Sequence, residues 1–568
     1  MATVRPEDFT TPNPGVWRFD PVHFPRPMSR IAAEVLSPAV AAGTVIGAQR
    51  YGALTGALLL EPILRFRYTR VAPLVPRPAG NEEQARAAFD RIVQEHPEVQ
   101  ARVAAAQRAL DTRLWVEDVR RWDSDEKPRA VAGTLALAAV DIVALDTPTL
   151  ASHVAEALDH LATTLARHHS FNSTWTIPLG IFLTRGAEWT GLNGGELLAL
   201  LKGASPISSG QTPELEALAA ALRSDPAASQ LLESGDAPAS IIAGLRALPG
   251  ATGEAARGFL DLHGFACVGG FDTVETYALE RPETVIASIR AATGREATPP
   301  ADIARVEEAT AAVRLLVPME HREAFDTVLA DARQCYRIKD ERGLYNDFPA
   351  RGLVRRAIME VGRRLRASGR LVEAEHALEA GPAELQDLLA GSGPSAEELQ
   401  ARYAYRLDNS DATPPATVGT ADGSDVPAAW LPEAVRRVQR ATGAALQAMG
   451  GGAAPEPLAA APRTLRGVAA SRGVYEGPTR IVTSPTDFAR IEQGDVLVTL
   501  ATTPAISAWL PLLGAIVTNF GGPLSHAAIV AREFGLPAVV GTGSATRTFH
   551  DGQRLRVDGA AGTVEPLD

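Results

Sequence analysis

The stretch GGGAAPEPLAAAP at 450–462 separates two parts of the sequence whose apolar residues follow different patterns. It is rich in glycine and then in proline, and Glu456 is its only charged residue, which is typical of an interdomain linker. Helical spacing dominates before it, and short strand-like runs dominate after it. We therefore predict a mainly α N-terminal domain over 1–449, a hinge linker over 450–465 and a small α/β domain over 466–568.

Length and linker reach agree with this division. A chain of 568 residues is too long for one hydrophobic core, so several domains are expected. The linker spans roughly 20 Å as a flexible coil and at most about 45 Å when extended. This reach suits a small domain that moves between two sites.

The N-terminal part shows helical patterns over most of its length. Residues 81–122 combine helical spacing with charged outer faces, and Asp146-Thr147-Pro148 has the capping residue and early proline of a helix start. Leu158 and its apolar neighbours should form the buried face of that helix: Val154, Leu158, Leu161, Leu165. Further helices are expected in these ranges: 30–65, 193–202, 213–223, 283–293, 302–333, 350–368, 432–449.

The C-terminal part reads as strands separated by turns. The runs GVYEGPTRIV, GDVLVTL, AIVTNF, PAVVG and RLRVDGAAGTVEPL are short and apolar, and a single helix is expected after His526.

Composition excludes several classes of function. The net charge of -12, with no basic run, argues against a nucleic-acid surface. The apolar stretches are too short to span a membrane, and the N-terminus has no signal-peptide pattern. Cys267 and Cys335 are too isolated for a disulfide framework or a thiolate metal site. We therefore expect a soluble cytoplasmic protein.

Lysine is scarce, occurring only at Lys127, Lys202 and Lys339. Nucleotide phosphates are usually held by a glycine-rich loop with a nearby lysine, and none of these three follows such a loop. The sequence therefore predicts that the chain alone lacks a complete ATP site.

The segment NFGGPLSHAAIVAREFGLPAVVG places His526 behind a Gly521-Gly522 turn and ahead of an apolar helix. A helix N-terminus presents unpaired amides and partial positive charge, and the glycines let a large group approach. A neutral histidine nitrogen is nucleophilic near neutral pH and can accept a phosphoryl group. The phosphoryl-binding candidates are Gly521, Gly522, Ser525 and Arg532. The alternative is a histidine that only caps or packs at a turn.

This segment closely resembles the phosphohistidine motif of PEP-utilising enzymes. The resemblance extends over Gly521, Gly522, Ser525, His526, Ala528, Ile529, Ala531, Arg532, Glu533, Gly535, Pro537 and Gly541. It implies a swivelling domain with a covalent phosphohistidine intermediate on His526, shared by phosphoenolpyruvate synthase, pyruvate phosphate dikinase and rifampicin phosphotransferase. Leu524 stands where the first two families have threonine, so regulation by phosphorylation at that position is not expected.

The resemblance also implies a reaction. The sequence resembles the acceptor and histidine parts of rifampicin phosphotransferase, and it ends at Asp568 without the barrel that binds pyruvate in phosphoenolpyruvate synthase. It is similar in arrangement to phenylphosphate and alkylphenol phosphate synthases, whose ATP-grasp part is a separate subunit. We expect ATP and Mg²⁺ on such a partner, a small phenol as acceptor, and AMP and phosphate as by-products. The alternatives are a larger natural-product or antibiotic hydroxyl, or phosphoryl delivery to another protein.

Residues of the N-terminal part that could hold the acceptor lie in two segments. RIKDERG at 337–343 falls where the resembling enzymes carry an Arg-Glu pair, so Glu341 with Arg337 or Arg342 is the candidate pair. HHSFNSTW at 168–175 offers His168 or His169 as a base and Trp175 as an apolar wall.

Simpler interpretations of both segments stay open. The charged residues at 337–343 could form a solvated helix face. His153, His160 and His168 are seven and eight residues apart, which is not the one-turn spacing of helical zinc ligands, so no metal site is predicted. Ordinary helix surface and core packing are the alternatives for the histidines and Trp175.

Overall fold

The computed structural model describes residues 4–294, 300–449, 464–502, 506 and 509–567. It divides into two compact units, each of which gathers separate stretches of the chain. Unit 1 comprises Met1–Trp175, Phe265–Thr276 and Glu341–Arg440, and unit 2 comprises Thr176–Gly264, Tyr277–Asp340 and Ala441–Asp568. The predicted linker at 450–465 lies almost entirely outside the described residues, so the domain boundary stays a prediction.

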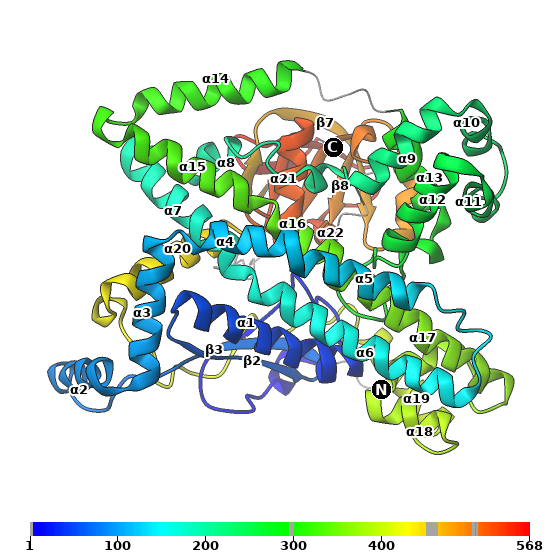
Figure 1. The fold of residues 1–568 in the computed structure, drawn as a ribbon, viewed down its shortest axis with the longest axis horizontal. Helices are drawn as coiled ribbons and strands as arrows, with labels where there is room; N and C mark the ends of the chain where they lie inside the picture. The colour runs from blue at the N-terminus through cyan, green and yellow to red at the C-terminus, as the bar shows by residue number, and fades with distance from the viewer. Residues whose placement is uncertain (1–3, 295–299, 450–463, 503–505, 507–508, 568) are drawn as a thin grey trace. The chain divides into compact units, whose positions relative to one another are not determined.

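Three long helices lie at the core of unit 1: α1 (Ser37–Tyr51), α6 (Thr147–Ser170) and α17 (Phe348–Ala367) (Figure 1). The predicted start of α6 is confirmed, because the Asp146 side chain accepts a hydrogen bond from the backbone N–H of Thr149 at 2.9 Å. Its predicted apolar face is also confirmed, since these residues are buried in the core: Val154, Leu158, Leu161, Leu165. The other long helices of this unit are α2 (Glu82–Glu95), α3 (Pro97–Asp111), α4 (Leu114–Arg121), α5 (Lys127–Ala138), α18 (Pro382–Leu389) and α19 (Ala396–Asp408).

Unit 1 also contains a four-stranded sheet in the order β2-β3-β1-β4. Its strands are β1 (Trp17–Phe19), β2 (Thr55–Ile63), β3 (Phe66–Pro73) and β4 (Thr417–Val418). The helix expected within 30–65 is present as α1, but the end of that range forms β2. The hairpin turns at Leu64 and Arg65, whose φ angles are 49° and 67°. Neither residue is a usual turn former, which is why the hairpin gave no sequence signal.

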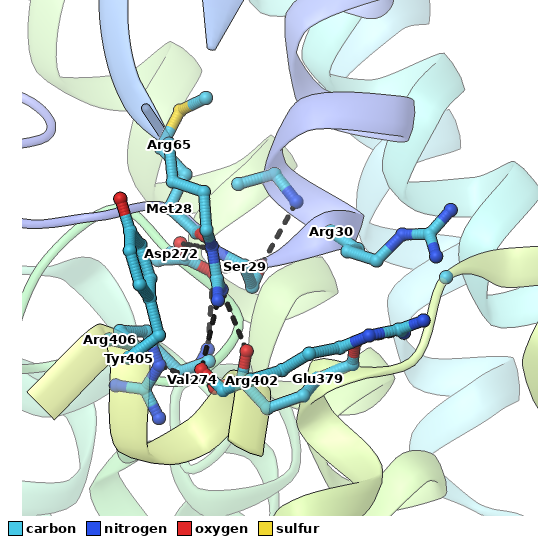
Figure 2. Close-up of polar contacts among 12 residues, drawn as sticks. Met28, Ser29, Arg30, Arg65, Asp272, Val274, Glu379, Arg402, Tyr405 and Arg406 are labelled. Atoms are coloured by element: carbon cyan, nitrogen blue, oxygen red, sulfur yellow. Dashed lines mark hydrogen bonds and ion pairs between the residues drawn. The ribbon is translucent and has the colours of Figure 1, made fainter. Parts of the chain in front are cut away.

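A buried cluster of arginines and carboxylates ties distant segments of unit 1 together (Figure 2). Glu379 is fully buried and accepts from Arg65 Nη2 at 2.7 Å and Arg406 Nε at 2.6 Å. Asp272 accepts from the backbone N–H of Ser29 at 2.8 Å and from its hydroxyl at 2.5 Å. These charge-assisted bonds fix the segment Phe265–Thr276 within the unit.

The helical part of unit 2 has its own apolar core, formed by α9 (Pro213–Ser224), α10 (Pro226–Leu232), α11 (Pro238–Ala247), α12 (Gly250–His263) and α13 (Pro282–Thr293). The pattern at 302–333 corresponds to two helices, α14 (Pro300–Leu316) and α15 (Arg322–Tyr336). Pro318 separates them, because proline lacks a backbone donor and disfavours helix at the residue before it. The remaining helices that bear on the site are α7 (Asn172–Thr190), α8 (Gly194–Ala199), α16 (Ile338–Arg342) and α20 (Glu433–Ala448).

The C-terminal part of unit 2 contains an eight-stranded sheet in the order β5-β12-β11-β7-β8-β9-β10-β6. The predicted strand runs are confirmed as β7 (Val474–Val482), β8 (Asp495–Thr499), β9 (Leu513–Thr518), β10 (Ala538–Val540), β11 (Arg554–Asp558) and β12 (Thr563–Pro566); the short β5 (Leu465–Arg466) and β6 (Val468–Ser471) precede them. Strands β7 to β10 pair in parallel. Alternate residues enter opposite cores, with Leu497 on one face and Val496 and Val498 on the other.

Helix α21 (His526–Phe534) packs on the first of these faces (Figure 1). It is not the single helix of this part, since the short α22 (Ala545–Thr548) follows β10. Within the part of the chain that the structure describes, no helix is both long and apolar enough to cross a lipid bilayer.

Candidate active site

A glycine turn leads from β9 into α21 and sets the position of His526. Gly521 has a φ of 126°, a region that favours glycine, and a Cβ there would lie 2.7 Å from the Ser525 hydroxyl. Ser525 caps the helix by accepting from the backbone N–H of Ala528 at 3.4 Å. The helix begins at His526 and ends at Gly535, which has a φ of 67°. His526 therefore lies at the helix start that the sequence predicts.

The two ring nitrogens of His526 have different environments. Nδ1 lies 2.8 Å from the Thr502 hydroxyl oxygen. Nε2 is buried and has no hydrogen-bond partner among the described residues. If Nδ1–H donates to Thr502, Nε2 keeps its lone pair and is the nitrogen available for attack.

The surroundings of His526 keep its imidazole neutral. Burial and, after it, the positive charge of Lys339 lower the pKa of His526 to about 4, and the charge of Asp340 opposes this shift. At neutral pH the imidazole is therefore unprotonated. An unprotonated and unpaired nitrogen is the form that attacks phosphorus.

Lys339 and Asp340 form an anchored ion pair on α16. Lys339 Nζ lies 2.9 Å from Asp340 Oδ1. Asp340 Oδ2 accepts from the hydroxyl of Ser205 at 2.6 Å and from that of Ser208. The pKa of Asp340 is lowered because Lys339 and the two hydroxyls outweigh its burial. The fixed carboxylate of Asp340 therefore holds Lys339, whose charge lowers the pKa of His526.

The segment at 188–209 supplies further contacts to the C-terminal part within unit 2. The backbone N–H of Gly203 donates to Glu533 Oε1 at 3.0 Å, and Arg472 pairs with Glu196 at 3.1 Å. The backbone N–H of Leu524, in the turn before His526, donates to the carbonyl of Ala448 at 2.7 Å. Tyr336 is buried near Arg532 and Glu533, and burial raises the pKa of its hydroxyl.

Arg532 forms hydrogen bonds to the backbone of β6 and of the turn before His526. Its guanidinium donates to the carbonyl oxygens of Ala470 at 3.0 Å and Pro523 at 2.6 Å. Arg532 therefore helps to hold the turn in place, and its role as a phosphoryl ligand stays a prediction. Gly522 is buried and Ser525 is half-buried, and both lie within the turn that precedes His526.

The acceptor-site candidates are divided between the two units. Arg337 ends α15 in unit 2. The other five share unit 1: His168, His169, Trp175, Glu341, Arg342. Glu341 accepts from Trp122 Nε1 at 2.8 Å and pairs with Lys127 at 3.2 Å. Its pairing with Arg337 or Arg342 stays a prediction.

Arg342 brings the remaining unit 1 candidates together. Its Nη1 donates to the carbonyl oxygen of His168 at 3.1 Å and to the side chain of Asn172. Its guanidinium carbon lies 5.4 Å from the ring centre of Trp175, whose Nε1 has no hydrogen-bond partner among the described residues. Nδ1 of His169 lies 3.3 Å from Nδ2 of Asn172. Burial holds the pKa of His169 well below its usual range.

His168 forms a dyad with Asp347, a residue that the sequence did not single out. His168 Nδ1 lies 2.6 Å from Asp347 Oδ1, and Arg351 pairs with the other carboxylate oxygen at 2.7 Å. Asp347 has a lowered pKa because Arg351 and His168 outweigh its burial.

The described residues contain no group of three or more His, Cys, Asp or Glu side chains that could hold a metal ion.

The sequence analysis did not identify Lys339, Asp340 or Asp347 as site residues, because their sequence signals are weak. Lys339 is one of three lysines, and Asp340 follows it directly, but their link to Ser205 spans 135 residues. Asp347 lies 179 residues from His168. No local pattern reports such pairings.

Two family models of known proteins match parts of this chain. Residues 491–562 match the family model of the PEP-utilising enzyme mobile domain, and residues 169–340 match that of the rifampicin phosphotransferase fourth domain. The first match contains His526 and the second contains Ser205, Lys339 and Asp340.

Relatives with known names cover part of the chain. Rifampicin phosphotransferase of Streptomyces sviceus is 30% identical over 341 residues, which is 57% of this chain and 36% of the relative. Rifampicin phosphotransferase of Bacillus cereus is 47% identical over 104 residues, or 18% of this chain and 12% of the relative. A probable phosphoenolpyruvate synthase of Archaeoglobus fulgidus is 45% identical over 100 residues, or 18% and 13%. The chain thus spans about a third or less of the length of these relatives. It carries a mobile domain of the PEP-utilising enzymes, together with a part similar to the fourth domain of rifampicin phosphotransferase.

Proposed function

We propose that the chain is a phosphotransferase that accepts a phosphoryl group on Nε2 of His526 and passes it to the hydroxyl group of a small-molecule acceptor. One observation carries this proposal. Nε2 is buried, neutral at pH 7 and without a hydrogen-bond partner among the described residues, while Nδ1 is held by Thr502. Nε2 belongs to the first residue of α21, directly behind the glycine turn, where the unpaired amides of a helix N-terminus favour a phosphoryl group.

Two displacements at phosphorus make up the reaction. In the first, the lone pair of Nε2 forms a bond to phosphorus, and the bond from phosphorus to the donor's leaving oxygen breaks. The proton on Nδ1 stays in its hydrogen bond to Thr502. In the second, the acceptor oxygen attacks the same phosphorus, the P–N bond breaks, and its electron pair returns to Nε2. The hydroxyl proton passes to a base.

Lys339 is suited to bind the phosphoryl oxygens on His526. Its charge already acts on the ring, and Asp340 fixes its position. A cation near the equatorial oxygens stabilises the charge that they carry through the transition state.

For the donor, we propose Mg-ATP bound to a separate ATP-grasp partner, with AMP and phosphate as by-products. The resemblance to split-subunit phosphotransferases and the scarcity of lysine support this arrangement. The described residues of this chain offer no cluster of carboxylates to hold Mg²⁺. When bound, Mg²⁺ would neutralise charge on the ATP phosphates.

For the acceptor, the comparisons favour the hydroxyl of a natural product or antibiotic, because a relative that matches 57% of this chain is named rifampicin phosphotransferase and residues 169–340 match the fourth domain of that family. A phenol is the second candidate. It is favoured by the aromatic rings of Phe271 and Phe348, whose centres lie 5.9 Å apart beside Arg351 in unit 1.

Intact-mass measurement tests the proposal. The chain is incubated with phosphoramidate, which phosphorylates histidine chemically, and we expect the mass of one phosphoryl group to appear. His526→Ala should abolish it, and His550→Ala, which changes an exposed histidine of the same part of the chain, should not. Equal phosphorylation of wild type and His526→Ala would refute the proposal. AMP formed from Mg-ATP by this chain alone would refute the separate partner.

A further inference from the structure

We infer that His168, oriented by Asp347, is the general base that takes the proton from the acceptor hydroxyl, and that this hydroxyl belongs to an aromatic ring. The inference rests on the proposed function, because it needs a phosphoryl group on His526. The residues that carry it all belong to unit 1.

Hydrogen bonding fixes which nitrogen of His168 is basic. Asp347 is 1% exposed and ionised, so its Oδ1 can only accept a hydrogen bond from the Nδ1–H of His168. Nε2 then carries the lone pair. No described residue forms a hydrogen bond with Nε2 of His168, and this nitrogen is not completely buried. The side chain keeps 15% of its surface exposed, so a ligand hydroxyl can approach this nitrogen.

Arg351 keeps the dyad in this state. It is 5% exposed and pairs with the Asp347 oxygen that His168 does not use. The carboxylate is thereby held as an anion in one orientation, and the imidazolium that forms when His168 accepts a proton has a counter-charge ready.

Aromatic rings lie next to the dyad. A Cβ at Gly343 would lie 3.3 Å from the Phe348 ring and 3.7 Å from Cε1 of His168, so the backbone at this glycine lies close to both rings. Phe348 contacts Phe271 at 5.9 Å between ring centres, and both are half-buried. Asp272 holds the segment of Phe271 by its bonds to Ser29 (Figure 2). Aromatic side chains of this kind stack favourably against a flat aromatic acceptor.

The strength of the base agrees with an aromatic hydroxyl. Burial, followed by Arg342, lowers the pKa of His168 to about 4 against the opposing effect of Asp347. This keeps the imidazole neutral and ready to accept a proton, but it makes the base weak. A phenol, with a pKa of about 10, gives up its proton far more readily than an alkyl alcohol.

The transfer step balances through these groups. The phenol oxygen forms its bond to phosphorus while the P–N bond to His526 breaks and its electrons return to Nε2 of His526. The phenol proton moves to Nε2 of His168, which becomes an imidazolium paired with Asp347. The aryl phosphate leaves, and His168 releases the proton to water.

The test measures transfer from His526 that has been charged with phosphoramidate. Substituted phenols of graded acidity and an aliphatic alcohol of similar size serve as acceptors. We expect His168→Gln to charge normally by intact mass and to transfer to weakly acidic phenols about 10²- to 10⁴-fold more slowly. The defect should shrink as the phenol becomes more acidic, and nitrophenol should react at a rate near that of the wild type. His153→Gln, which changes a buried histidine of the same helix, should transfer normally.

Each other outcome has a defined meaning. Transfer by His168→Gln within about threefold of wild type, or a defect equal for every phenol, overturns the assignment of the base. Equal transfer to the aliphatic alcohol overturns the acceptor class. Charging that fails in the wild type itself overturns the proposed function, and intact mass separates that failure from the other two.

Discussion

Burial and, after it, the charge of Lys339 set the pH range in which His526 can act. The positive charge of the lysine disfavours the imidazolium, so replacing the lysine with an uncharged side chain should raise the pKa of His526 above about 4. Protonated Nε2 cannot attack, and the acid limit of charging should move to higher pH in Lys339→Met. The ratio of variant to wild-type charging rates, measured by intact mass from pH 8 to pH 4, should fall toward the acid end. Lys202→Met is the control, and a ratio independent of pH would contradict the prediction.

Thr502 holds Nδ1 of His526 through a single hydroxyl. Thr502→Val keeps the shape of the side chain but leaves Nδ1 without its partner at 2.8 Å. The loss of one hydrogen bond, worth about 0.5–1.5 kcal/mol, corresponds to charging slowed by roughly two- to tenfold. Thr502→Ser retains the hydroxyl and should charge at nearly the wild-type rate. Equal rates for the valine and serine variants would show that the contact does not matter.

At the scale of elements, the turn before α21 depends on Gly521. Alanine there would adopt a strained φ of 126° and place its Cβ 2.7 Å from the Ser525 hydroxyl, which caps the helix. We expect Gly521→Ala to lose about 1–3 kcal/mol of stability and to charge His526 more slowly. Gly535→Ala at the far end of α21 has a φ of 67° and open space around it, so it should lose stability without slowing charging. Thermal unfolding and intact mass measure the two effects.

Elements with a local pattern were predictable, and those without one were not. The strands around Val474–Val482 and Asp495–Thr499 are short apolar runs between turns, and α6 has a capping aspartate and helical leucine spacing. Strand β2 lies in the continuous apolar run YGALTGALLL, where periodicity cannot separate helix from strand. His526 was predictable because its turn, cap and helix are adjacent in sequence. The His168–Asp347 dyad was not, since folding alone brings its members together.

At the scale of the whole molecule, the residues around His526 come from three separate stretches of unit 2. The C-terminal sheet supplies the histidine, the segment at 194–209 supplies Ser205 and Ser208, and α16 supplies Lys339 and Asp340. A phosphoryl group cannot reach Nε2 while this nitrogen stays buried. We therefore infer that charging requires the contact between the C-terminal part and the segment at 194–209 to open, at least transiently.

The contact between Arg472 and Glu196 makes this requirement testable. Arg472 Nη2 lies 3.1 Å from Glu196 Oε1, so Arg472→Glu would place a second carboxylate opposite that of Glu196. The repulsion should favour separation of the C-terminal part from the segment that carries Glu196. Because the two side chains are 80% and 32% exposed, the pair contributes less than about 1 kcal/mol, so we expect phosphoramidate to charge His526 about two- to fivefold faster. Adding Glu196→Arg restores opposite charges and should return the rate to that of the wild type. If the reversed pair charges as fast as Arg472→Glu alone, the contact does not control access to His526.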